Sequence, residues 1–262
     1  VLVTAAIVRK RLPWTNACLL ASIGVASHLL LDWSMSYGMR LLLPFSSAWS
    51  YLDIFSLTDW VVVAVLLAAW LWPFLARLVS DEIGARRSTG RGVAIAALVF
   101  FVLYGGFRAV LHERAIEQLE SRLYPEHEGL VQRVAALKES LNPFEWNGFV
   151  ETGDAYHLYQ VPSFQNLDPG AGSTFYKQEW TADVAAASKT VPFQAMSYFA
   201  RFPLWQNQRA LDPTDTGVVT LTDVRFGQPG RNFFEVFALL DAQHNVRHAD
   251  FGPGPLATRD RR

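Results

Sequence analysis

The sequence contains only one cysteine, Cys18, which lies inside an apolar run. A single cysteine excludes an intrachain disulfide and a zinc cluster made of cysteine thiolates, so Cys18 is expected to fill space in a packed core. The sequence also has no Gly-x-Ser-x-Gly, Walker or Gly-x-Gly-x-x-Gly pattern. The nucleophile elbow, the phosphate-binding loop and the dinucleotide-binding fold therefore find no support.

The start of the sequence lacks the positively charged segment with which a signal peptide begins. Residues 1–8, VLVTAAIV, are instead typical of the last turns of an apolar helix. We therefore expect the sequence to be a fragment, or an incompletely predicted chain, whose N-terminal part is missing.

Charged residues are divided unevenly along the chain, although the net charge is only −1. Residues 1–112 hold nine lysines and arginines against five aspartates and glutamates, whereas the other 150 residues hold fourteen against nineteen. A cationic, apolar half followed by an acidic, polar half predicts a membrane anchor joined to a water-soluble domain. The same division gives no reason to expect nucleic acid as a partner.

Three apolar segments are long enough to cross a bilayer, which requires about 20 residues of helix. They are residues 14–33, 61–79 and 92–110. With residues 1–8, they predict an α-helical membrane domain of three full spans and a partial N-terminal one. Arg108, near the end of the last span, is expected to snorkel to the membrane surface.

Two basic clusters define the orientation of these spans. Residues 9–11 and 86–91 carry arginine and lysine in connections between apolar segments, and such clusters mark the cytoplasmic side of a membrane. The sequence therefore predicts a multi-pass membrane protein with its C-terminal half outside the cytoplasm. Residues 39–43, followed by Pro44, are expected to form a short apolar element in or near the membrane interface.

The second half of the chain changes from helical to strand-like patterns. The charge-rich segment 113–140 predicts a connecting helix. From residue 142 onward, short alternating runs predict strands, interrupted by short helices at 181–189 and 192–201. The predicted organisation is a membrane domain (1–112), a helical connector (113–140), an extracytoplasmic α+β domain (141–251) and a disordered tail (252–262).

His28 and Asp32 are the most suggestive pair of polar residues in the membrane half. They are four residues apart, which is about one helical turn, so they share one face of the segment 14–33. Ionisable residues in a span are costly and usually face a bundle interior or a water-filled cavity. Imidazole and carboxylate are both good zinc ligands, so the pair is a candidate metal site. Alternatively, Asp32 lies at the membrane surface and His28 contacts a neighbouring helix.

Asp53 and Asp59 are the other acidic residues in the same stretch. Both could return to the outer end of the helix that carries His28 and Asp32 and serve there as a ligand or a general base. Either could equally cap a helix, Asp59 in particular, because it lies just before the span at 61–79. The remaining histidines have no metal-binding spacing; they are His112, His127, His157, His244 and His248.

These residues also carry a resemblance to a known family. The stretch 27–60 reads SHLLLDWSMSYGMRLLLPFSSAWSYLDIFSLTDW. Its characteristic residues are His28, Asp32, Tyr37-Gly38, Pro44-Phe45-Ser46, Asp53 and Asp59. The stretch resembles the signature of the membrane-bound metal-dependent hydrolases, the YdjM-like family of bacterial inner-membrane proteins, and residues 141–152 and 198–203 are similar to segments of its longer members.

The resemblance implies a hydrolase in which histidines and aspartates hold a divalent metal, with zinc the expected ion. His28 and Asp32 would be metal ligands, and Asp53 and Asp59 would act in catalysis. The family also carries an earlier Thr-His, a Pro-Asp-x-Asp and a second Thr-His, and none of these is present in this sequence. The ligand set of this chain is therefore expected to be incomplete.

Two hypotheses of function follow from the sequence. The first is a membrane-bound metal-dependent hydrolase that acts on a phosphoester or a lipid at the outer face of the inner membrane. The second is a non-enzymatic, membrane-anchored binding or structural module, in which the His28–Asp32 pair only ties helices together. Membrane lipid is an expected partner in both.

Overall fold

The computed structural model describes residues 13–56, 58–83, 90–122, 130–138, 142–208, 217–227 and 234–252, with the backbone alone for residues 77–83. The chain divides into two compact units. The first contains residues up to 122 together with 134–148 and 159–170, and the second contains 123–133, 149–158 and the chain from 171 onward. The first unit therefore holds the helices predicted to cross the membrane.

Two helices of the first unit are long and apolar enough to cross a membrane: α2 (Trp14–Ser34) and α4 (Arg91–Glu120). None of the apolar window of α2 is buried, and only 6% of that of α4 is. A helix that is apolar on all sides and is not buried in protein is suited to lipid. Pro13 precedes the first turn of α2, where its missing N–H costs nothing.

The third helix of the unit, α3 (Trp60–Ile83), has a shorter described apolar stretch, Trp60–Ala76. The structure thus has two candidate spans, fewer than the three full spans and the partial one that the sequence predicts. The difference arises because side chains beyond residue 76 in α3, like all of residues 1–12, lie outside the described part of the chain. The basic clusters at 9–11 and 86–87 also lie outside it.

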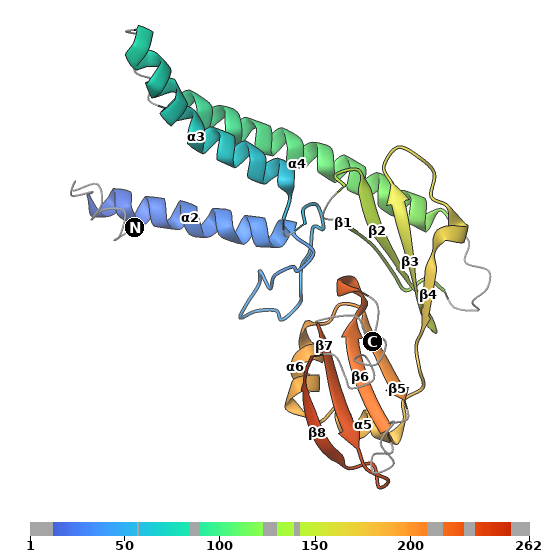
Figure 1. Cartoon of the computed structure of the whole chain (residues 1–262). Coiled ribbons are helices and arrows are strands. Elements are labelled where there is room, and N and C mark those ends of the chain that lie inside the picture. Colours follow the sequence, from blue (N-terminus) through green and yellow to red (C-terminus); the bar gives the residue numbers. More distant parts are fainter. Residues whose placement is uncertain are drawn as a thin grey trace. The chain divides into compact units, whose positions relative to one another are not determined.

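Helix α4 does not end with its apolar segment but continues to Glu120 as one helix. Its last turns lie beside those residues of β1 (Arg133–Lys138), β2 (Glu145–Glu151) and β3 (Ala155–Pro162) that belong to the same unit (Figure 1). The face that it buries in these last turns consists of Leu111, Ala115 and Leu119, each at most 4% exposed. The prediction of a helix over 113–140 is wrong at its C-terminal end, where β1 (Arg133–Lys138) is a strand. Burial of residues 135–137 in a sheet overrides the helix propensity of this alanine- and leucine-containing segment.

The loop between α2 and α3 is fixed to the end of α2. Met39 and Ser50 form an antiparallel bridge, and Trp33 Nε1 donates a 2.8 Å hydrogen bond to Ser50 Oγ. Gly38 has φ +71°, and a Cβ there would lie 2.2 Å from Cδ1 of Tyr51, so only glycine fits this close approach. The turn beyond the bridge exposes four large apolar side chains: Leu41, Leu42, Leu43 and, at 94% exposure, Phe45.

The first sheet has the strand order β1-β2-β3-β4, with β2 at Glu145–Glu151, β3 at Ala155–Pro162 and β4 at Ser173–Tyr176. Helix α4 packs closely on this sheet at Gly148, because a Cβ there would lie 2.8 Å from Leu119 Cδ2 and 2.9 Å from Val161 Cγ2. Trp146 is completely buried, and its Nε1 donates a 3.1 Å hydrogen bond to Ser163 Oγ.

The second sheet is antiparallel and has the order β5-β6-β7-β8. Its strands are β5 (Pro203–Gln208), β6 (Gly217–Asp223), β7 (Glu235–Leu240) and β8 (Val246–Phe251). Two short helices, α5 (Ala182–Ala187) and α6 (Val191–Phe199), lie together beside it (Figure 1). They confirm the helices predicted near 181–189 and 192–201. Two 3-10 turns complete the described elements, η1 (Pro169–Ala171) and η2 (Val224–Phe226).

The core of the second unit lies between these two helices and the sheet. Phe193 of α6 is fully buried and stacks on Trp205 of β5, with ring centroids 5.4 Å apart. Val219 and Leu221 of β6 also belong to this core. They are two residues apart, so their side chains lie on the same face of the strand. A helical N-terminal part is thus followed by a sheet-rich part, as the sequence predicts.

Candidate functional site

The predicted pairing of His28 with Asp32 on one helical face is confirmed. Their Nε2 and Oδ2 atoms are 3.4 Å apart on α2, and the side chains are 74% and 42% exposed. Both residues belong to the C-terminal half of the helix, close to the loop that leads to α3. The pair is therefore preformed and accessible to a further ligand.

Asp59 caps helix α3. Its Oδ1 accepts hydrogen bonds from the backbone N–H groups of Val61 and Val62, at 3.1 and 3.3 Å. The hydroxyl of Tyr104 on α4 lies 3.2 Å from Oδ2 and 3.3 Å from Oδ1. Because it is only 8% exposed and has these three donors, the carboxylate ties the start of α3 to α4. Of the two roles that the sequence allows for Asp59, this geometry is that of the helix cap.

Asp53 is 4% exposed and has a left-handed backbone, with φ +57°. Aspartate tolerates this conformation better than most residues. Its two chain neighbours fix it in place, because the N–H groups of Leu52 and Ile54 donate 3.0 Å hydrogen bonds to the carbonyls of Trp33 and Ser34. Asp53 thus marks the point where the loop turns back along the end of α2.

The four predicted site residues do not form one cluster. Among the residues that the structure describes, no three histidine, cysteine, aspartate or glutamate side chains lie close enough together to hold a metal ion. Structural zinc sites use four protein ligands and catalytic ones three, whereas the His28–Asp32 pair supplies two. The described residues therefore do not fit a complete zinc site.

Arg108 is a key residue of this region, and its role differs from the predicted one. Its guanidinium is completely buried rather than snorkelling to the surface. Its Nε and Nη2 donate to the carbonyl of Ile54 in the loop, at 3.3 and 3.2 Å, and its Nη1 donates to the carbonyl of Pro143. The guanidinium also lies 4.2 Å from the ring centroid of Trp146. It therefore joins α4, the loop and the start of β2.

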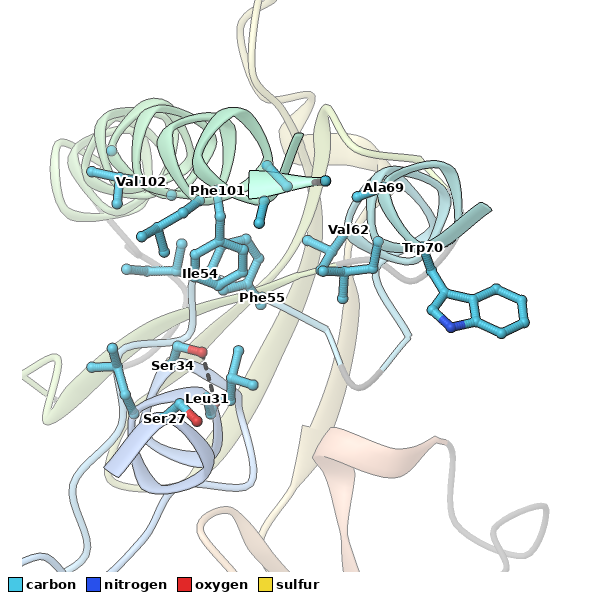
Figure 2. Close-up of a pocket in the computed structure, with 18 of the residues that line it drawn as sticks. Ser27, Leu31, Ser34, Ile54, Phe55, Val62, Ala69, Trp70, Phe101 and Val102 are labelled. Atoms are coloured by element: carbon cyan, nitrogen blue, oxygen red, sulfur yellow. Dashed lines mark hydrogen bonds between the residues drawn. The ribbon is translucent and has the colours of Figure 1, made fainter. Parts of the chain in front are cut away.

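An open apolar cavity of about 1060 Å³, hereafter the interhelical cavity, lies between the helices of the first unit. Figure 2 shows Ile54, Phe55 and Phe101 lying between the helices, whereas the indole of Trp70 points away. Its lining comes from α2, from the loop at residues 52–55, from α3 and from α4. The sequence gives no signal for this cavity, because it depends on how the helices diverge.

The second unit contains a smaller polar cluster at the start of α5. His244 Nδ1 lies 2.6 Å from Asp183 Oδ1, and Asn207 Nδ2 donates to Asp183 Oδ2 at 3.0 Å. His248 belongs to strand β8, so the spacing of four between it and His244 is not a helical spacing.

Glu151 forms ion pairs with two basic residues in the second unit. Its carboxylate lies 2.7 Å from Arg133 Nη2 and 2.8 Å from Lys177 Nζ. Burial alone would raise the pKa of Glu151, but the hydrogen bonds and charges of Lys177 and Arg133 outweigh burial and lower this pKa below its usual value. Burial raises the pKa of the adjacent Tyr156, and the charge of Glu151 raises it further.

The lowered pKa of Glu151 predicts a pH dependence of stability. A carboxylate whose pKa is depressed on folding stabilises the protein above its unfolded pKa, about 4.3 for glutamate. This stabilisation is lost as the pH falls through the folded pKa. The melting temperature, measured between pH 7 and pH 3, should therefore decline steeply below about pH 4.3. In Glu151→Gln this decline should be less steep. Glu179→Gln, at an exposed position of the same unit, is the control; an equal flattening there would contradict the prediction.

The comparisons with known proteins concern the N-terminal half. Residues 1–115 match the family described as the YdjM inner membrane protein. No curated protein and no solved structure gives a significant match to the chain. The family match includes His28, Asp32, Asp53 and Asp59, and it ends before the segments 141–152 and 198–203, whose resemblance to longer members stays a prediction.

Proposed function

We propose that the chain is a multi-pass protein of the bacterial inner membrane that acts as a membrane-anchored binding or structural module. Two candidate spans and the similarity of residues 1–115 to an inner membrane protein family support its place in the membrane. The observation that carries the proposal is that polar residues near the outer ends of the helices form contacts within the protein. Arg108 and Asp59 bind protein groups and hold the elements together, rather than facing a reaction site.

Helix α4 is the anchor in this proposal. It continues as one helix from its apolar segment to the turns in which Leu111, Ala115 and Leu119 are buried. Because the helix is continuous, no flexible linker separates its apolar segment from its last turns, and the two are held in a fixed relative position. The part of the first sheet that belongs to the same unit as α4 is thereby held next to the membrane surface, and under the positive-inside rule this surface is the extracytoplasmic one.

We also assign α3 to the membrane. It has 24 residues, which at 1.5 Å per residue gives roughly 36 Å, more than the roughly 30 Å of a hydrocarbon core. Pro73 lies inside it, and membrane helices tolerate proline where neighbouring groups satisfy the freed carbonyl. With three spans, the C-terminal half lies outside the cytoplasm.

A metal-dependent hydrolase is the second candidate function, and the accessible His28–Asp32 pair favours it. This pair would supply two ligands to a divalent ion, with zinc expected from the imidazole and carboxylate donors. The other ligands would come from residues outside the described ranges. The substrate would be a phosphoester or a lipid at the outer face of the membrane, and Asp53 and Asp59 would need to leave their present positions to act in catalysis.

The replacement His28→Ala separates the two functions. For a module, we expect the metal content of the purified full chain to stay unchanged and the free energy of unfolding to fall by less than about 0.5 kcal/mol, because exposed pairs at this spacing contribute little. Metal content is measured by elemental analysis, with phosphodiesterase activity as the second readout. Loss of a bound metal in His28→Ala, but not in the control Ser22→Ala on the same helix, would overturn the module and support the hydrolase.

A further inference from the structure

The interhelical cavity is a feature of the first unit that the proposed function does not use. It is bounded by α2 at Leu30 and Leu31, by α3 at Leu66 and Ala69, and by α4 from Arg91 to Gly106. It extends from the loop residue Phe55 near one end of the helices to Gly90 near the other. The long axis of the cavity therefore runs along the helices, which is the shape that an extended chain-like molecule requires.

The cavity offers almost nothing to a polar ligand. Its two serines are already satisfied, because Ser27 Oγ donates to the carbonyl of Gly24 at 2.9 Å and Ser34 Oγ donates to that of Leu31 at 2.6 Å. The rest of the lining is aliphatic or aromatic apart from Arg91 and backbone groups. Such a lining suits a hydrocarbon better than ordered water, which needs polar partners.

Among the described residues that line the cavity, Arg91 alone carries a charged side chain. It is the first residue of α4 and is exposed. Among the described residues, no carboxylate lies within ion-pair distance of it. A single cation at the end of a long apolar cavity complements a molecule with an anionic head and a hydrocarbon tail. Basic groups between membrane helices bind anionic lipid headgroups in this way.

We propose that the interhelical cavity binds an anionic phospholipid, with one acyl chain between α2, α3 and α4 and its phosphate at Arg91. The inference rests on the proposed placement of these helices in the membrane. It adds to that placement a specific lipid site, which differs from the general lipid contact of every spanning helix in having both a defined volume and a charge.

Adjacent alanines on α4 provide a matched test of the acyl-chain site. Ala97 lines the cavity and Ala96 does not, so Ala97→Trp fills it whereas Ala96→Trp adds the same side chain outside. The full chain is purified in detergent, supplied with equal amounts of phosphatidylglycerol and phosphatidylcholine, and examined by native mass spectrometry. We expect the wild type and Ala96→Trp to retain phosphatidylglycerol and Ala97→Trp to retain at least tenfold less. Equal retention by both tryptophan variants would overturn the site.

Substitution of Arg91 tests the headgroup separately. Arg91→Gln should abolish the preference for phosphatidylglycerol over phosphatidylcholine, and Arg91→Lys should keep it. An unchanged preference in Arg91→Gln, or equal retention of the two lipids by the wild type, would overturn the assignment of the phosphate to Arg91.

A second pair of variants and a fractionation experiment separate failure to fold and failure to enter the membrane from loss of the lipid site. If Ala97→Trp fails to fold, Ala69→Phe and Ala68→Phe on α3 repeat the comparison, because Ala69 lines the cavity and Ala68 does not. Fractionation of each variant with membranes tests the proposed placement on its own. A chain that does not fractionate with membranes contradicts the proposed function, whereas a membrane-bound chain without lipid retention contradicts only the lipid site.

Discussion

Replacement of Arg108 by alanine is expected to lower the free energy of unfolding by about 4 kcal/mol. The guanidinium is 0% exposed and donates to the carbonyls of Ile54 and Pro143. Each buried carbonyl left without a donor costs about 1–3 kcal/mol, and the lost contact with the Trp146 ring costs about 1–2 kcal/mol more. Unfolding in detergent, followed by tryptophan fluorescence, measures the change, because Trp146 lies against the substituted side chain.

Two variants distinguish this specific loss from a general effect of altering α4. Arg114→Ala removes an exposed arginine of the same helix and should change the free energy of unfolding by less than about 0.5 kcal/mol. Arg108→Lys keeps the charge but has no planar fork to reach two carbonyls, so its stability should lie between those of the wild type and Arg108→Ala. If Arg108→Ala and Arg114→Ala were equally stable, Arg108 would not hold the loop and β2 to α4.

The features of the first unit that depend on local spacing could be predicted from the sequence. A separation of four residues places His28 and Asp32 on one face of a helix wherever that helix lies, and the structure has them 3.4 Å apart. The position of Asp59 just before an apolar segment made a helix cap one of its two expected roles, and its contacts with Val61 and Val62 are those of a cap. Such inferences need only the geometry of one helix.

The role of Arg108 could not be predicted, because its partners lie 54 and 35 residues away in the sequence. The snorkelling that the sequence suggests is the usual outcome for an arginine near the end of a span. Here the loop and the start of β2 cover the helix end, so the guanidinium meets carbonyl oxygens before it reaches water. Only the tertiary arrangement decides between these outcomes.

The strand at residues 133–138 was hidden for a similar reason. Alanine, leucine and lysine favour a helix locally, and the segment follows the charge-rich end of α4. Its conformation depends on the neighbouring strand of the sheet, since residues 135–137 are buried there. The interhelical cavity likewise cannot be predicted from the sequence, because its lining is brought together from three helices and the loop at residues 52–55.

Replacement of Asp223 by alanine is expected to destabilise the second unit by about 3–5 kcal/mol, the cost of leaving one member of a buried ion pair without its partner. Asp223 and Arg225 are 0% and 1% exposed in their side chains, with Oδ2 and Nη2 2.7 Å apart. The carboxylate also accepts hydrogen bonds from the backbone N–H groups of Arg201 and Arg225, at 2.9 and 3.0 Å. Thermal unfolding of the full chain, followed by circular dichroism, measures the loss.

A double replacement shows whether the loss of stability comes from the unpaired charge of Arg225. Arg225 lies beside the stacked rings of Phe199 and Phe226, with its Cζ 5.1 and 5.0 Å from their centroids, so methionine at this position keeps an apolar side chain in the same space. If the unpaired guanidinium is what destabilises Asp223→Ala, adding Arg225→Met should recover part of the loss, because buried pairs replaced by apolar groups are often nearly neutral. No recovery would mean that the two backbone N–H donors, rather than the charge of Arg225, make Asp223 indispensable.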